Sequence, residues 1–185
     1  MTHDPEHLAF DYPFKVRKLA KKGQHIRYSV EEDARQRIAT DYDLIEVRSF
    51  DVDCKVTPWK SDGVELTGVL RAEIVQPCAV SAEPLAQSIR EEIEFIFLPE
   101  GSKLLRPPRF EEQEMILDPM GDDVPDTFTG DSLDLAGPWL ETFAVGIDPF
   151  ARIEGAEFSS DNLDSERESP FAALAALKTD TKTPD

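Results

Sequence analysis

Cysteine and histidine are scarce in this chain. Its 185 residues include 2 cysteines and 3 histidines. Cys54 and Cys78 belong to no CxxC pair, and all the histidines lie near the N-terminus, without the spacing of zinc ligands. We therefore expect neither a metal site nor a disulfide scaffold. Unpaired thiols also fit a reducing cytoplasm.

Long apolar runs and familiar catalytic motifs are also missing. No stretch approaches the apolar length that crosses a bilayer, and the opening sequence MTHDPEHLAFDYPFK lacks the sections of a signal peptide. There is no GxSxG, GxGxxG or GxxxxGKS/T sequence, and 38 acidic residues are too many for one carboxylate pair to stand out. The sequence predicts a cytoplasmic protein with no cofactor, and nothing in it indicates an enzyme.

Positive charge is scarce in the second half of the chain. Residues 1–90 hold 15 acidic and 13 basic residues, whereas residues 91–185 hold 23 acidic and 7 basic residues. An acidic half repels phosphate backbones and attracts basic partners. Residues 15–27 are the exception, because they include six basic residues and no acid, which favours either RNA contact or a solvated face beside the core. The candidate RNA-contact residues are Lys15, Arg17, Lys18, Lys21, Lys22 and Arg27.

Apolar periodicity predicts two packing helices. Ser29 stands three residues before Glu32, the spacing of a capping box, and predicts a helix over residues 30–41. Asp134 is a candidate cap for a second helix that ends near Gly146. The side chains expected to face the core are Ala34, Ile38, Tyr42 and Ile45 from the first helix, and Leu135, Trp139, Leu140, Phe143 and Ile147 from the second.

Alternating apolar and polar residues predict strands between the helices. The stretches FDVDCKV (50–56) and VELTGVLRAEIV (64–75) alternate and are joined by a WKSDG turn, which predicts an antiparallel hairpin. Cys54 then points inward, and Gly68 indicates a bulge or a close approach of two backbones. Ile and Phe crowd the sequence after Ile89, which we interpret as a further strand. We expect an α+β fold, with two helices on an antiparallel sheet of four or more strands that is either open or barrel-like.

Residues 1–158 are expected to form one domain, with a long acidic excursion at about 99–131. Residues 159–185 are expected to form a disordered acidic tail that contains a short amphipathic helix at 170–178. This helix is a candidate for docking to a partner; packing on its own domain and fraying in solvent are the alternatives. The side chains that would dock are Phe171, Leu174 and Leu177.

The stretch VQPCAVSAEP bears on the role of Cys78. A thiol becomes reactive when cations or a helix N-terminus stabilise its thiolate, whereas this stretch offers prolines, small apolar residues and one glutamate. We predict a buried structural cysteine at the end of a strand. A redox or metal role is the alternative.

Three segments, in this order, resemble the YceD family, the large ribosomal RNA subunit accumulation proteins, in its alphaproteobacterial form. They are LTGVLRAEIVQPCAVSAEPLAQSIREEIEFIF, DLAGPWLETFAVGIDPFAR and PFAALAALK, and the similarity spans about residues 10–178. The chain departs from the family pattern at Ser81-Ala82 and Phe150-Ala151, and lacks a second cysteine near the first turn, so no metal site carries over. The residues that match the family signature are Gly68, Gln76, Cys78, Glu83, Pro84, Asp134, Leu135, Glu141, Asp148, Pro149 and Arg152.

The resemblance implies a cytoplasmic, non-enzymatic factor for the accumulation, processing or stability of 23S ribosomal RNA in ribosome biogenesis. The expected partners are large-subunit ribosomal RNA, a basic ribosomal protein or an assembly factor, with no membrane involved. Two alternatives stay open. One is a metal-dependent RNA-processing enzyme, based only on the abundance of acids, and the other is an acidic module that binds a basic ribosomal protein.

Overall fold

The computed structural model describes residues 8–105 and 125–156. The predicted tail, its helix with Phe171, Leu174 and Leu177, and most of the acidic excursion lie outside these residues. In chain order the elements are β1 (Pro13–Lys15), the 3₁₀ turn η1 (Val16–Lys18), β2 (Gln24–Ser29), α1 (Glu32–Asp41), β3 (Glu46–Trp59), β4 (Gly63–Pro77), β5 (Pro84–Pro99), β6 (Asp126–Phe128), β7 (Ser132–Asp134) and α2 (Ala136–Gly146).

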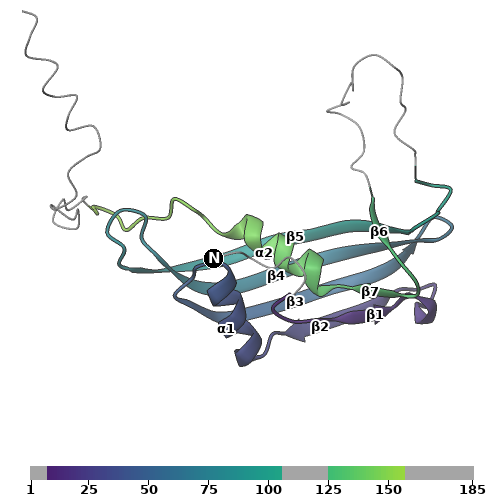
Figure 1. The fold of residues 1–185 in the computed structure, drawn as a ribbon, viewed down its shortest axis with the longest axis horizontal. Coiled ribbons are helices and arrows are strands. Elements are labelled where there is room, and N and C mark those ends of the chain that lie inside the picture. Colours follow the sequence, from purple (N-terminus) through teal and green to yellow (C-terminus); the bar gives the residue numbers. More distant parts are fainter. Residues whose placement is uncertain (1–7, 106–124, 157–185) are drawn as a thin grey trace, which may run out of the picture.

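A five-stranded sheet in the order β2-β3-β4-β5-β6 dominates the fold (Figure 1). β2 to β5 pair antiparallel, and β3, β4 and β5 are long because their apolar residues alternate over 14, 15 and 16 residues. Val52 faces Leu70, and Ala72 faces Ile89, so that one side of the sheet is apolar across all three strands. The predicted hairpin and the strand around Ile89 are confirmed.

The two helices and a separate β1–β7 pair cover the apolar side of the sheet (Figure 1). Trp139 on α2 is completely buried, and its ring lies 4.8 Å from that of Tyr12 and 5.7 Å from that of Tyr28. Phe143, one turn further along α2, lies 5.1 Å from Phe50 of β3. The sequence therefore builds a single aromatic core under α2, and the predicted α+β class with two packing helices is confirmed.

The start of α1 differs from the prediction. The helix begins at Glu32, and no side chain caps it, so the predicted capping box is wrong. Ser29 is the last residue of β2 and lies opposite Asp51 on β3. Its hydroxyl therefore donates to the Asp51 carboxylate and does not cap the helix. Ile45 is also not a core residue, since it is 51% exposed after the helix has ended.

The edges of the sheet were not predicted. The second half of the basic segment is strand β2, in which Ile26 is buried and Tyr28 is half-buried. β6 lies parallel to β5, so the sheet is mixed and not purely antiparallel. Among the described residues β2 and β6 are separate edges, and the sheet is open and not closed into a barrel. In those residues neither helix has the length and apolar character needed to cross a membrane.

Candidate functional site

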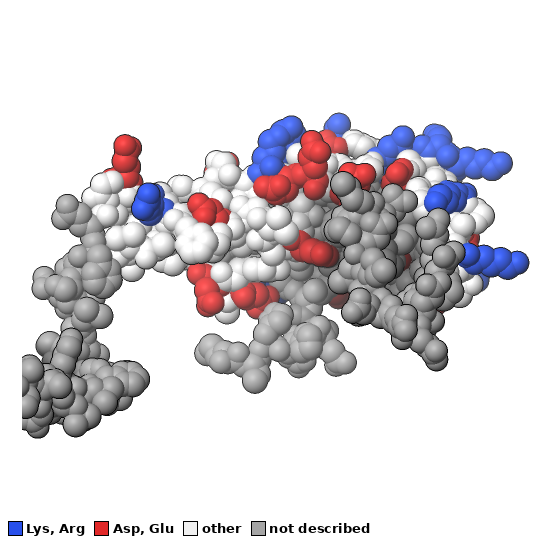
Figure 2. Space-filling model, turned by 90° about the horizontal axis from the view of Figure 1, so that it is seen from above, with Lys and Arg blue, Asp and Glu red and all other residues white. Residues whose placement is uncertain are grey.

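Basic side chains gather at one end of the sheet. β1, η1 and the turn before β2 bring five of the six predicted RNA-contact residues to this end, all of them exposed: Lys15, Arg17, Lys18, Lys21 and Lys22. The Gly23 N–H donates to the carbonyl of Ala20, with Gly23 at φ +79°, which closes a tight turn with Lys21 and Lys22 at its tip. In Figure 2 blue side chains concentrate at the right, the end where Figure 1 shows β1.

Strand β3 adds two lysines that the linear sequence did not place with this group. An ideal Cβ on Gly23 would lie 2.7 Å from both Thr57 Cγ2 and the Val56 carbonyl, so the turn rests directly on β3. Lys55 faces His25 on β2, and Lys60 follows the end of β3 with its ammonium 3.9 Å above the Trp59 ring. We call the seven residues the basic end: Lys15, Arg17, Lys18, Lys21, Lys22, Lys55 and Lys60.

Arg27, the sixth predicted contact residue, does not belong to the basic end. It lies on the open side of the sheet with its Nε 3.2 Å from Asp53, which also lies 2.5 Å from His25 Nε2. Partial burial opposes ionisation of Asp53, but the hydrogen bond and charge of His25, together with Arg27, hold its pKa below the ordinary value. The charge of Arg27 is therefore already compensated by Asp53. At the basic end, Arg17 is also paired, at 3.2 Å from Asp131.

Several signature residues meet at the opposite end of the sheet. The Gln76 side chain is buried and donates to the carbonyl of Asp148, at 2.9 Å. In the same place the Ala79 N–H donates to the carbonyl of Ala151, at 2.9 Å. Glu83 and Pro84 complete the turn, where the carbonyl of Glu83 accepts from the N–H of Cys78. These bonds fasten the chain that leaves α2 to the β4–β5 turn, while the side chains of Glu83, Asp148, Pro149 and Arg152 stay exposed.

Other signature residues lie inside the fold. The Asp134 carboxylate accepts from the N–H groups of Tyr12, at 2.8 Å, and Ala136, at 3.0 Å, so it ties the N-terminal segment to the start of α2. Leu135 is completely buried beside it, whereas Glu141 is exposed on α2. Gly68 is the predicted close approach and not a bulge, because the only irregularity between β3 and β4 falls between residues 47 and 49.

The two cysteines occupy different environments. Both are buried and unpaired, Cys54 at 1% and Cys78 at 3% exposed, as predicted. Burial raises the pKa of the Cys54 thiol to about 12. The Ser81 hydroxyl, followed by backbone N–H groups that include that of Ile153 at 3.4 Å, lowers the pKa of the Cys78 thiol to about 7. Most of this effect is local, since Ser81 and Val80 follow Cys78 in the turn, and only the Ile153 N–H comes from the chain after α2. The prediction that nothing near Cys78 in the sequence stabilises its thiolate is therefore wrong.

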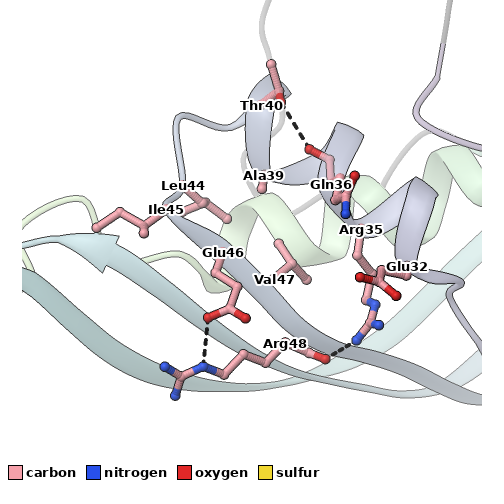
Figure 3. A pocket seen from close by; sticks show the side chains of 10 residues that line it. All are labelled: Glu32, Arg35, Gln36, Ala39, Thr40, Leu44, Ile45, Glu46, Val47 and Arg48. Carbon is pink, nitrogen blue, oxygen red and sulfur yellow. Dashed lines mark hydrogen bonds and ion pairs between the residues drawn. The ribbon is translucent and has the colours of Figure 1, made fainter.

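A pocket of about 290 Å³ lies between α1 and the start of β3 (Figure 3). Arg35 donates to the backbone carbonyl of Arg48, although its Nε is buried with no hydrogen-bond partner among the described residues, and Arg48 Nε lies 3.0 Å from Glu46. The rest of the lining consists of Glu32, Gln36, Ala39, Thr40, Leu44, Ile45 and Val47. β2 pairs with β3 only from Asp51 to Val56, so the Arg48 carbonyl has no strand partner on that side, and the Arg35 side chain of α1 bonds to it instead. The polar lining of the pocket thus serves the contact between α1 and β3.

Within the described ranges no three His, Cys, Asp or Glu side chains come together as a metal site would require. No family model, curated protein or solved structure matches the chain. The candidate site is therefore described from its residues alone. The basic end lies at one tip of the sheet, and the β4–β5 turn, hydrogen-bonded to the chain after α2, lies at the other.

Proposed function

We propose that this protein is a non-enzymatic factor for the accumulation, processing or stability of 23S ribosomal RNA, and that it contacts RNA through the basic end. The resemblance of three segments, which follow one another in the same order as in the YceD family, supports the biological role. The observation that carries the RNA contact is the gathering of seven Lys and Arg residues at one tip of a chain whose net charge is -18. Elsewhere an approaching phosphate backbone meets mainly repulsion.

The basic end sets the expected strength and salt dependence of RNA binding. Arg17 forms an ion pair with Asp131, and the Lys60 ammonium lies over the Trp59 ring, so neither is fully available to RNA. The other lysines of the basic end offer contacts to about four phosphates. The logarithm of the binding constant should then fall with the logarithm of the salt concentration with a slope of about -3 to -4. Lysines at the tip of a turn bind phosphates without reading bases, so affinity should depend little on RNA sequence.

A charge-reversed variant tests the contact. Lys18→Glu, Lys21→Glu and Lys22→Glu together should abolish binding to a fragment of 23S RNA and flatten the salt slope, as measured by filter binding or fluorescence anisotropy. The matched control reverses three exposed arginines away from the basic end, namely Arg48, Arg71 and Arg90. It changes the net charge by the same amount and should retain most of the binding. Equal binding by wild type and the lysine variant would make the basic end a solvated face.

A genetic experiment tests the biological role separately. Deletion of the gene should lower the ratio of mature 23S to 16S RNA, and the wild-type gene, but not the lysine variant, should restore it. An unchanged ratio across growth conditions would remove the proposed function. Restoration by the lysine variant would keep the role but assign it to another surface.

A further inference from the structure

Strand β5 has an unpaired edge over most of its length. It spans Pro84–Pro99, and within the described residues only Phe97, Leu98 and Pro99 pair with β6. Its other neighbour is β4, and no backbone hydrogen bond between residues 85–96 and any other described residue lies outside that ladder. Figure 1 shows β5 along the upper border of the sheet, with β6 beside one end only. The outward N–H and C=O groups along residues 85–96 therefore have no backbone partner in the part of the chain that the structure describes.

This edge lacks most of the devices that stop a strand from accepting another one. β5 is long, its register with β4 is continuous from Val64↔Phe97 to Pro77↔Pro84 without a bulge, and its two prolines stand at its ends. Charge is the device that is present, since Arg90, Glu91, Glu92 and Glu94 interrupt its apolar residues. Acidic side chains repel an acidic strand but attract a basic one.

The two sides of the edge offer different chemistry. On the open side of the sheet Glu92 and Glu94 are exposed, together with Arg90 two residues before Glu92, and Glu91 lies half-buried on the helix side. On the helix side the end of α2 rests on β5, where Gln87 donates to the Gly146 carbonyl, at 3.0 Å. Next to this contact stand Val145, 78% exposed, and Phe150, 79% exposed. Figure 2 looks onto this border from above and shows red and blue groups beside one another near the middle, with further blue groups at the right.

From these observations we propose that the edge of β5 is a docking site for an extended basic segment of a partner protein, which adds to the sheet as a further strand. Alternating side chains of that segment face opposite sides of the sheet. Its basic side chains lie on the open side, next to Glu92 and Glu94, and its apolar side chains lie on the helix side, near Val145 and Phe150. The segment is thus recognised by alternating basic and apolar residues, while its backbone supplies the hydrogen bonds.

Charge disfavours the other candidates for this edge. A second copy of the chain would bring a strand with three acids and one arginine against the same strand, and like charges on paired strands are destabilising. The segments of this chain outside the described residues, 1–7, 106–124 and 157–185, hold 15 acidic and 5 basic residues, a net charge of -10. This docking site is separate from the basic end, so it holds or fails independently of the RNA contact.

Binding of a designed peptide to the full-length protein tests the proposal. The probe is a fluorescent peptide in which Lys and Val alternate over about twelve residues, the length of the free edge. Two reference peptides have the same composition: one with the lysines and valines in separate blocks, and one N-methylated at alternate backbone nitrogens, which removes the hydrogen bonds of one strand edge. We expect the alternating peptide to bind at least about tenfold more tightly than either reference. Equal binding of all three would overturn the proposal.

Variants and hydrogen exchange then locate the peptide. Glu92→Gln with Glu94→Gln should weaken its binding about three- to fivefold at low salt, whereas Glu32→Gln with Asp33→Asn on α1 should change it less than about twofold. Bound peptide should slow amide exchange in residues 85–96, and lack of protection there would overturn the proposal. Only the N–H groups of residues 85–96 that point away from β4 bear on the proposal, because those that point toward β4 are protected in any case. Protection of the outward N–H groups in the free protein would overturn it too. If that protection rises with protein concentration, a second copy occupies the edge, and if it does not, the chain's own residues do.

Discussion

Replacement of Gly68 by alanine should destabilise the fold sharply, because two strands touch at this glycine. Gly68 lies directly opposite Cys54, and an ideal Cβ on it would lie 2.5 Å from Cys54 Cα, Cys54 Cβ and the carbonyl oxygen of Asp53. Cβ atoms of residues paired across a sheet are normally about 4.5 to 5.5 Å apart. Two of the three obstacles are backbone atoms of a central strand, so relief requires β3 and β4 to separate. We expect a loss of about 2 to 3 kcal/mol in the free energy of unfolding.

Urea and thermal unfolding of the full-length protein, followed by circular dichroism, would measure this loss. The midpoint of thermal unfolding should fall by about 5 to 10 °C. Gly137→Ala is the matched control, because its new Cβ would meet only Leu8 Cδ1, at 4.0 Å, and alanine favours the helix by up to about 1 kcal/mol. Cys54→Gly should not rescue Gly68→Ala, since the backbone obstacles remain. If Gly68→Ala is as stable as the wild type, the argument from close approach is wrong.

Three further predictions concern side chains inside or beside the core. Asp134→Ala should cost about 1 to 2 kcal/mol in urea unfolding, because the backbone N–H groups of Tyr12 and Ala136 lose their acceptor. Asp131→Ala, which removes only an exposed ion pair, should cost less than about 0.5 kcal/mol. Equal effects would contradict the role of Asp134 as the acceptor for these two groups. Iodoacetamide should alkylate Cys78 before Cys54, because the pKa of the Cys78 thiol is lowered to about 7 and that of the Cys54 thiol is raised to about 12. The rate of Cys78 alkylation should have its pH midpoint near 7. Peptide mapping by mass spectrometry that finds Cys54 modified first would reject this order. The lowered pKa of Asp53 adds stability above its ordinary pKa of 3.8, and this stability is lost as pH falls through the lowered value. Asp53→Asn should therefore be less stable than wild type at neutral pH, with the difference shrinking under strongly acidic conditions, and a difference that is constant with pH would argue against the pairing.

The strands and the second helix were predictable because their signals are local and strong. Alternation in β3 and β4 placed every core residue from Phe50 to Ile74 on the correct side of the sheet. Asp134 was expected to cap the second helix, but the helix begins at Ala136 with Leu135 at its N-cap and no side-chain cap. Asp134 lies one residue earlier and accepts from the N–H groups of Tyr12 and Ala136. The start of α1 failed because Ser29 had two plausible partners, and pairing with Asp51 in the sheet was the one that formed. A linear pattern does not rank a local cap against a cross-strand partner.

The surfaces depended on contacts between distant residues. The basic segment was visible in the sequence, but only the register of β2 on β3 brought Lys55 beside it and assigned Arg27 to Asp53. The environment of Cys78 gains one N–H group, that of Ile153, from the chain after α2, in addition to the groups of the local turn. The free edge of β5 had no signal at all, because the sequence of a strand does not reveal how many neighbours it has.

The sequence by itself determined the α+β class, the alternating sides of the long strands and the division into a nearly neutral first half and an acidic second half. Those properties follow from composition and from residue spacings shorter than one element, where the backbone geometry of a helix or strand dictates which side chains share a side. Tertiary structure alone decided the strand order, the parallel β6, the extent of the basic end and the open edge of β5. These features depend on contacts between elements that are distant in the sequence. Such contacts are determined by the packing of the whole core around Trp139 and Phe143, and not by any one segment.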